Sequence, residues 1–162
     1  MEKYSIGVIV DRTGSVISEK KMIEDSIKII AEALNNNYSQ EMKKKIIVTC
    51  IGEEDLLLPQ QVEKIKLEER MNMENIFEGK NIFELFDKIS NDEGIKKVFF
   101  YSDGYFKREN WEEFISNLKG NKKINEIERV SIGIGEGVNK TLLKEFSSKE
   151  KVFQYKDIFD LV

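Results

Sequence analysis

Residues 4–15 read YSIGVIVDRTGS, and this stretch decides the fold that we predict. Residues 4–10 form a compact run rich in β-branched side chains, which is typical of a strand buried on both faces. The run ends at the polar loop 11–15, in which Gly14 gives the backbone the freedom to turn. From about Ser18 onwards apolar residues recur at helical spacing, until three asparagines at 35–37 stop the pattern. Strand, loop and helix in this order indicate an α/β fold.

The same alternation continues along the rest of the chain. Further strands are predicted at 44–51, 56–67, 97–102, 128–134 and 152–155, and helices at 81–89, 111–118, 142–146 and 157–162. Pro59 suits an edge strand, because proline cannot donate a hydrogen bond to a sheet ladder. Residues 119–123 are predicted to be a loop. We find no linker, repeat or low-complexity segment, so we expect a single domain over 1–162 with a mostly parallel sheet.

Charge and composition weigh against several classes of protein. Thirty acidic and 26 basic residues give a formal charge of −4, whereas nucleic-acid-binding surfaces are usually basic. No apolar stretch approaches the roughly 20 residues that a bilayer-spanning helix needs. The first residues carry no apolar signal region. We therefore expect a cytoplasmic protein that binds neither nucleic acid nor membrane.

The chain has no histidine and a single cysteine, Cys50, which lies in an apolar run. An all-cysteine zinc site and an internal disulfide are therefore excluded, and the commonest general base is missing. Any metal site must be built from oxygen ligands, which magnesium, manganese and calcium prefer.

Two acidic loops directly follow predicted strands. One is the Asp11-x-Thr13-x-Ser15 loop, and the other contains Asp103 between Ser102 and a glycine. Ligands of open α/β sheets bind beyond the carboxyl ends of the strands. A carboxylate and two hydroxyls at alternate positions can turn toward one cation, and Asp103 could complete its shell through water. The alternative is that Thr13 or Ser15 simply caps the following helix.

These residues carry a resemblance to a known family. Residues 6–16 resemble the metal-ion-dependent adhesion site motif, Asp-x-Ser-x-Ser, of von Willebrand factor A domains. Residues 101–104 resemble the later Asp-Gly motif of that family, and residues 130–137 resemble the strand and glycine-rich turn that follow. The matches occur in the family's order and cover nearly the whole chain. The resemblance implies a Rossmann-like three-layer α/β sandwich, with one antiparallel edge strand and helices on both faces.

The resemblance also implies a site and a function. Asp11, Thr13 and Ser15 would bind Mg²⁺ or Mn²⁺, or alternatively Ca²⁺, and Asp103 would bind it directly or through water. In the family an acidic group of a protein partner often completes the coordination. The implied role is therefore protein recognition through a metal, without catalysis.

Lys80 departs from the family pattern, because it stands where the family has a threonine. Its ammonium group could occupy the space of the cation and pair with Asp11, which would leave a metal-free interaction domain. Alternatively, Lys80 points to solvent and the metal keeps fewer ligands, or Lys80 is only a surface charge of a loop.

The loop that begins at Asp11 is also similar to the Asp-Lys-Thr-Gly-Thr motif of the haloacid-dehalogenase-like superfamily. That resemblance implies a magnesium-dependent phosphatase with Asp11 as nucleophile and Lys80 beside the phosphate. Asp103 or Glu136 would then hold the metal. Lys140 argues against this alternative, because it stands where the superfamily has a second aspartate.

Aromatic residues and glycines give three smaller predictions. Trp111 lies in a helix that needs an apolar face, so we expect it in the core. Tyr105 and Phe106 follow the second acidic loop, where exposed aromatic rings could contact a partner. The glycines at 133, 135 and 137 lack the spacing of a dinucleotide-binding motif and are expected to form a turn.

Overall fold

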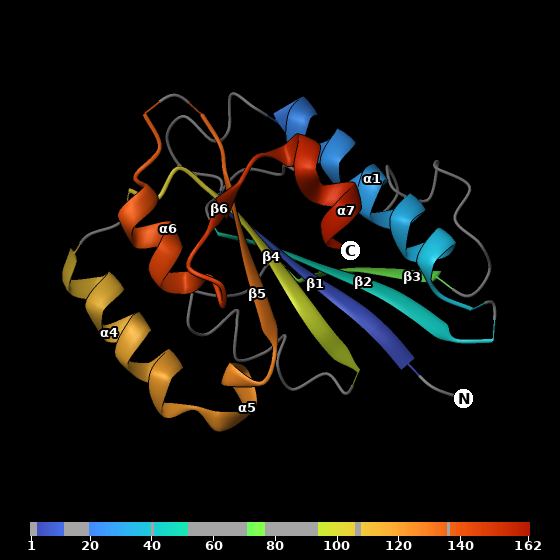
Figure 1. The fold of residues 1–162 in the computed structure, drawn as a ribbon, viewed down its shortest axis with the longest axis horizontal. Coiled ribbons are helices and arrows are strands. Elements are labelled where there is room, and N and C mark those ends of the chain that lie inside the picture. Colours follow the sequence, from blue (N-terminus) through green and yellow to red (C-terminus); the bar gives the residue numbers. More distant parts are fainter. Residues whose placement is uncertain are drawn as a thin grey trace.

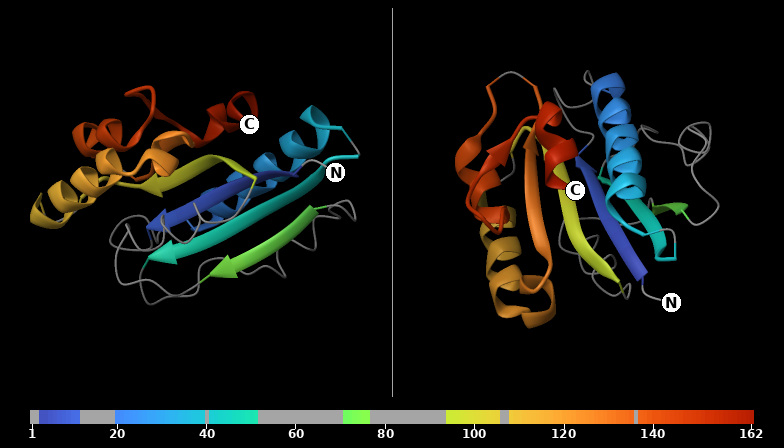
Figure 2. Two further views of the ribbon diagram at one scale, coloured as in Figure 1. Left: turned by 90° about the horizontal axis from the view of Figure 1, so that it is seen from below. Right: turned by 45° about the vertical axis from the view of Figure 1, so that its right-hand side comes forward.

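A computed structural model of the chain describes residues 3–11, 20–39, 41–51, 71–76, 94–105, 108–135 and 137–162. Its strands form one six-stranded sheet in the order β3-β2-β1-β4-β5-β6 (Figure 1). The strands are β1 (Lys3–Asp11), β2 (Lys43–Ile51), β3 (Met71–Ile76), β4 (Ile95–Ser102), β5 (Glu128–Gly133) and β6 (Val152–Phe153). Every described pair of neighbouring strands is parallel, and Figure 2 shows β1, β2 and β3 pointing the same way.

The chain changes direction across the sheet at β1. From β1 it steps outward through β2 to β3, and it then returns to β4 on the other side of β1. The register pairs Asp11 with Ile51 of β2 and Val10 with Tyr101 of β4. The carboxyl ends of β1 and β4 therefore lie next to each other at the point where the strand order reverses.

Helices cover both faces of the sheet. One core contains side chains of α1 (Lys20–Asn37) and α7 (Ile158–Leu161), and Figure 1 shows these helices beside each other. The other core contains side chains of α4 (Arg108–Gly120), α5 (Lys122–Asn125) and α6 (Lys140–Phe146). Alternate strand residues divide between the two cores, because successive side chains point to opposite faces. Val8 and Val10 pack under α1, whereas Ile9 packs under the α4 side.

Most of the predicted elements that fall on described residues are confirmed. Predicted strands correspond to β1, β2, β4, β5 and β6, and predicted helices to α1, α4, α6 and α7, with small shifts at their ends. The predicted strand at 56–67 and the predicted helix at 81–89 lie outside the described residues. The expected antiparallel edge strand is not among the strands that the structure describes. None of the described helices is long and apolar enough to cross a membrane, and the cytoplasmic location stays a prediction.

Two described elements differ from the prediction. The first is β3, whose residues MNMENI include asparagine and glutamate, which are uncommon in strands, so pairing with β2 rather than propensity defines it. The second is α5, which forms where residues 119–123 were predicted to be a loop. The side chain of Asn121 accepts a hydrogen bond from the backbone N–H of Ile124 at 3.1 Å, and Ile124 is buried. The Asn121 cap and the buried side chain of Ile124 therefore account for this single helical turn.

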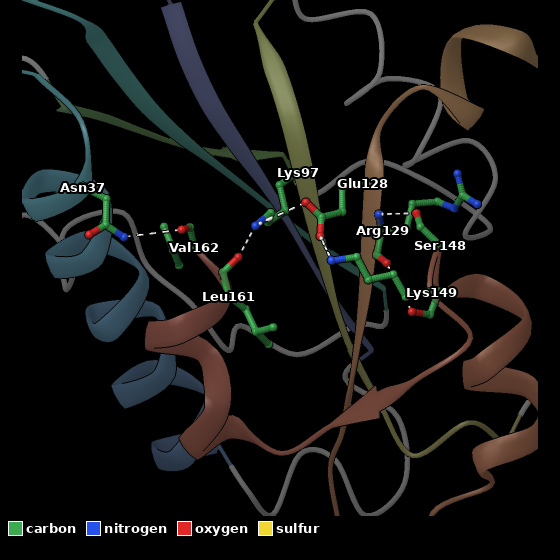
Figure 3. A network of polar contacts seen from close by, with 9 residues as sticks. Asn37, Lys97, Glu128, Arg129, Ser148, Lys149, Leu161 and Val162 are labelled. Atoms are coloured by element: carbon green, nitrogen blue, oxygen red, sulfur yellow. Dashed lines mark hydrogen bonds and ion pairs between the residues drawn. The ribbon is translucent and has the colours of Figure 1, made fainter.

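Lys97 joins the sheet to the last helix (Figure 3). Its Nζ lies 3.3 Å from Oε2 of Glu128, which is its partner in the β4–β5 register, and it donates a hydrogen bond to the carbonyl of Leu161. The side chain of Lys97 is 11% exposed, so its charge requires partners within the protein. Glu128 also lies 3.5 Å from Nζ of Lys149, a side chain that is 68% exposed. Lys97 thus satisfies a carbonyl at the end of α7 that the helix itself leaves unbonded.

Replacing Lys97 with methionine should destabilise the fold by about 1–3 kcal/mol, because the carbonyl of Leu161 and the carboxylate of Glu128 lose a nearly buried charged partner. Urea denaturation measures this change. Lys149→Met is the matched control, since it removes an exposed partner of the same glutamate and should cost less than about 1 kcal/mol. Equal losses of stability in the two variants would contradict the role of Lys97.

Candidate functional site

The two predicted acidic residues lie at the same edge of the sheet. Asp11 is the last residue of β1, and Asp103 directly follows Ser102, the last residue of β4. These two strands are neighbours, and Val10 is paired with Tyr101 one residue before their ends. The structure therefore brings the backbones of both acidic residues to the point where ligands of open α/β sheets bind.

The other predicted site residues lie outside the described residues. Thr13 and Ser15 fall in 12–19, Lys80 falls in 77–93, and Glu136 and Phe106 are also outside the description. The side chain of Asp11 is likewise not described. Their roles as ligands, as a modulator of the site or as a partner contact stay predictions.

Asp103 is 7% exposed and sits in a loop that is tightly hydrogen-bonded. Its Oδ1 accepts a hydrogen bond from the backbone N–H of Tyr105 at 3.1 Å. Its carbonyl accepts one from the N–H of Asn139 at 2.8 Å, and the carbonyl of Ser102 accepts one from Ile134 at 3.0 Å. The loop after β4 is therefore fastened to the segment after β5. Sequence reasoning missed this link, because no motif predicts contacts between two loops that are far apart in the chain.

Gly104 lies where the two loops meet. Its φ is +80°, a conformation that side chains other than glycine rarely adopt. A Cβ built on it would lie 2.4 Å from the carbonyl oxygen of Asn139 and 3.1 Å from Cγ of Leu143. The close approach of the two loops therefore requires glycine at this position.

Two glycines of the segment after β5 have backbone conformations that suit the predicted turn. Gly135 and Gly137 have positive φ of 91° and 66°. The carbonyl of Gly137 accepts a hydrogen bond from the hydroxyl of Tyr105, a residue that is 61% exposed, as a partner contact would require. Trp111, by contrast, is 2% exposed and packs on Phe114 with 5.2 Å between ring centroids, which confirms its place in the core.

A buried polar pair connects α1 to β4 near this edge. Tyr101, two residues before Asp103, shares a hydrogen bond with the hydroxyl of Ser26 on α1. Both side chains are fully buried. Burial raises the pKa of the Tyr101 phenol well above its ordinary value, so the hydroxyl stays protonated near neutral pH. Because α1 begins directly after residues 12–19, which include Thr13 and Ser15, this bond fixes the helix that follows these two predicted ligands.

Asp103 is the one predicted ligand whose side chain the structure describes, and its carboxylate is the oxygen donor that the predicted cation would need. Among the described residues no cluster holds three or more acidic, cysteine or histidine side chains. The absence of histidine from the chain agrees with such an all-oxygen site.

Replacing Gly104 with alanine should destabilise the protein by about 2–4 kcal/mol, because the new methyl group would clash with the carbonyl of Asn139 in a strained conformation. Chemical denaturation tests this. Gly120→Ala is the control: nothing lies within 4 Å of a Cβ built there, at the end of α4. That variant should change stability by less than about 1 kcal/mol. A Gly104→Ala protein as stable as the control would show that the loops can move apart without cost.

Comparisons with known proteins identify the fold. No family model and no curated protein matches the chain. Among solved structures, the conserved hypothetical protein BatB from Bacteroides thetaiotaomicron matches with a TM-score of 0.54 and 13% identity, over 97% of this chain and 96% of that chain. An aerotolerance-related membrane protein from Bacteroides fragilis gives the same score and identity, over 98% and 96%.

A third structure, a von Willebrand factor type A protein from Catenulispora acidiphila, matches with a TM-score of 0.56 and 14% identity. The match covers 99% of this chain and 42% of that one, so the chain spans less than half the length of this neighbour. Likeness at such low identity is a likeness of fold. Together with the parallel sheet and its strand order, it shows that the chain has a von Willebrand factor A-like α/β fold.

Proposed function

We propose that this chain is a protein-binding module that recognises its partner through a divalent cation, Mg²⁺ or Mn²⁺ or alternatively Ca²⁺, and that it catalyses no reaction. The observation that carries the proposal is the position of Asp11 and Asp103 at the adjoining carboxyl ends of β1 and β4. The proposed ligands are Asp11, Thr13 and Ser15, with Asp103 bound directly or through water.

The proposed chemistry follows from the small number of carboxylates among the proposed ligands. A cation held by one or two carboxylates and by neutral hydroxyl groups keeps much of its positive charge. Such a cation attracts a further acidic ligand, and a protein partner with an exposed aspartate or glutamate can supply it. The von Willebrand factor A-like fold of the chain supports this role by analogy.

Calorimetric titration of the metal-stripped protein with MnCl₂ and MgCl₂ tests the site. We expect about one cation per chain, and at least about 10-fold weaker binding in both Asp11→Asn and Asp103→Asn. Asparagine is chosen because its side-chain oxygen can still accept the hydrogen bond from Tyr105 when it replaces Asp103. Asp160→Asn is the control, because it removes the same charge from an exposed position on α7 and should bind metal like the unaltered protein.

Two results would contradict parts of the proposal. Hydrolysis of p-nitrophenyl phosphate that requires magnesium and disappears in Asp11→Asn would identify a phosphatase instead of a binding module. Absence of metal binding in every variant would indicate a metal-free interaction domain.

Lys80→Thr tests whether the lysine competes with the cation. If the ammonium group of Lys80 pairs with Asp11, its removal should strengthen manganese binding by about 10-fold or more, because a like charge no longer repels the cation. The same titration measures this. Unchanged affinity would place Lys80 away from the metal, as an ordinary surface charge.

A further inference from the structure

Tyr105 connects two loops at the carboxyl edge of the sheet, one through its backbone N–H and the other through its side-chain hydroxyl. Its backbone N–H donates to Oδ1 of Asp103 at 3.1 Å. Its side-chain hydroxyl donates to the carbonyl of Gly137, 32 residues further along the chain. One residue therefore contacts both the candidate carboxylate and the turn that follows β5.

The hydroxyl bond anchors a side chain that is mostly outside the core. Because the residue is 61% exposed, the ring of Tyr105 has less packing to define its rotamer than a buried ring has. The carbonyl that accepts this hydrogen bond belongs to Gly137, whose φ of +66° is a conformation that glycine adopts easily. Loss of the hydroxyl would release the ring and, with it, a restraint on the backbone of residue 105.

That backbone restraint bears directly on Asp103. Its carboxylate is oriented by the N–H of Tyr105, and its carbonyl by the N–H of Asn139. A carboxylate that serves a cation must be held in a narrow range of positions, and the groups that hydrogen-bond to it determine that range.

We propose that Tyr105 is a positioning residue for the cation site: its hydroxyl, bound to Gly137, holds the loop in which the Tyr105 N–H orients the Asp103 carboxylate. This inference rests on the proposed function, because it assigns Tyr105 a role at the metal site proposed there. It differs from a role in packing, since the group that matters is the hydroxyl and not the ring.

Tyr105→Phe tests the inference, because it keeps the ring and removes only the anchoring hydroxyl. In the metal-free protein, hydrogen exchange at the amide of residue 105 should become about 10-fold faster, while exchange in α4 stays unchanged. Affinity for Mn²⁺ should fall by about 10-fold, as is usual when a group that orients a ligand is lost. The urea midpoint should stay the same.

Tyr38→Phe is the matched control. Tyr38 stacks on Tyr4, with 4.0 Å between ring centroids, and Tyr4 is in the first part of β1, away from the carboxyl end. Removal of its hydroxyl should leave both the Mn²⁺ affinity and the exchange of residue 105 unchanged.

The outcomes separate the inference from the proposed function. If the unaltered protein binds Mn²⁺ and Tyr105→Phe binds it equally well with unchanged exchange, the positioning role is wrong and the metal site stands. If the unaltered protein binds no Mn²⁺, the metal site and the role of Tyr105 in it are both wrong. A lower urea midpoint that accounts for the loss of affinity would make Tyr105 a structural residue, which also overturns the inference.

Discussion

The pairing of β1 with β4 is the constraint on which the rest of the structure depends. β1 lies inside the sheet, with β2 on one side and β4 on the other, and its side chains enter both cores. A parallel neighbour on each side can be reached only through crossover connections, which place helices on the faces of the sheet. Because β1 and β4 are neighbours, the backbones of Asp11 and Asp103 lie at the same edge of the sheet, although the two residues are 92 positions apart in the sequence.

Polar contacts fix the helices to β4 at both ends of that strand. Near its amino end Lys97 binds the last carbonyl of α7, and near its carboxyl end Tyr101 binds Ser26 of α1. Both polar groups are removed from water, so each requires its partner, and a helix that shifted would leave it unsatisfied. Apolar packing alone tolerates small displacements better than a buried hydrogen bond does. The two contacts therefore specify where the helices lie on this face of the sheet.

The sequence was sufficient to predict the elements whose local pattern agrees with their environment. Residues 4–10 are mostly apolar and rich in β-branched side chains, as a strand buried on both faces requires, and α1 shows helical spacing from Met22 to Leu34. β3 could not be predicted, because Asn72, Glu74 and Asn75 give it no strand pattern and its order comes from pairing with β2. α5 was missed because a helix of four residues offers too few positions for a periodic pattern.

The candidate site also has features that the sequence predicts and features that it does not. The acidic residues could be found from the sequence, because each follows a predicted buried strand, and carboxyl ends of parallel strands share one edge. The contacts that hold the loop of Asp103 could not be found, since they join Ser102 to Ile134 and Asp103 to Asn139 through backbone groups that every sequence possesses. In the sequence, only Gly104 points to this contact, because it is a glycine directly after an aspartate. That pattern does not identify Asn139 as its neighbour.

The hydrogen bonds around Asp103 also bear on how a ligand would bind. A carboxylate that is already oriented by Tyr105, in a loop already fastened by Asn139, loses little conformational entropy when it contributes to a complex. The partner and any cation then bear most of the entropic cost of binding. The free energy of their contacts with the protein contributes to affinity. Under the proposed function, the hydrogen bonds that hold Asp103 would therefore favour recognition by lowering its entropic cost.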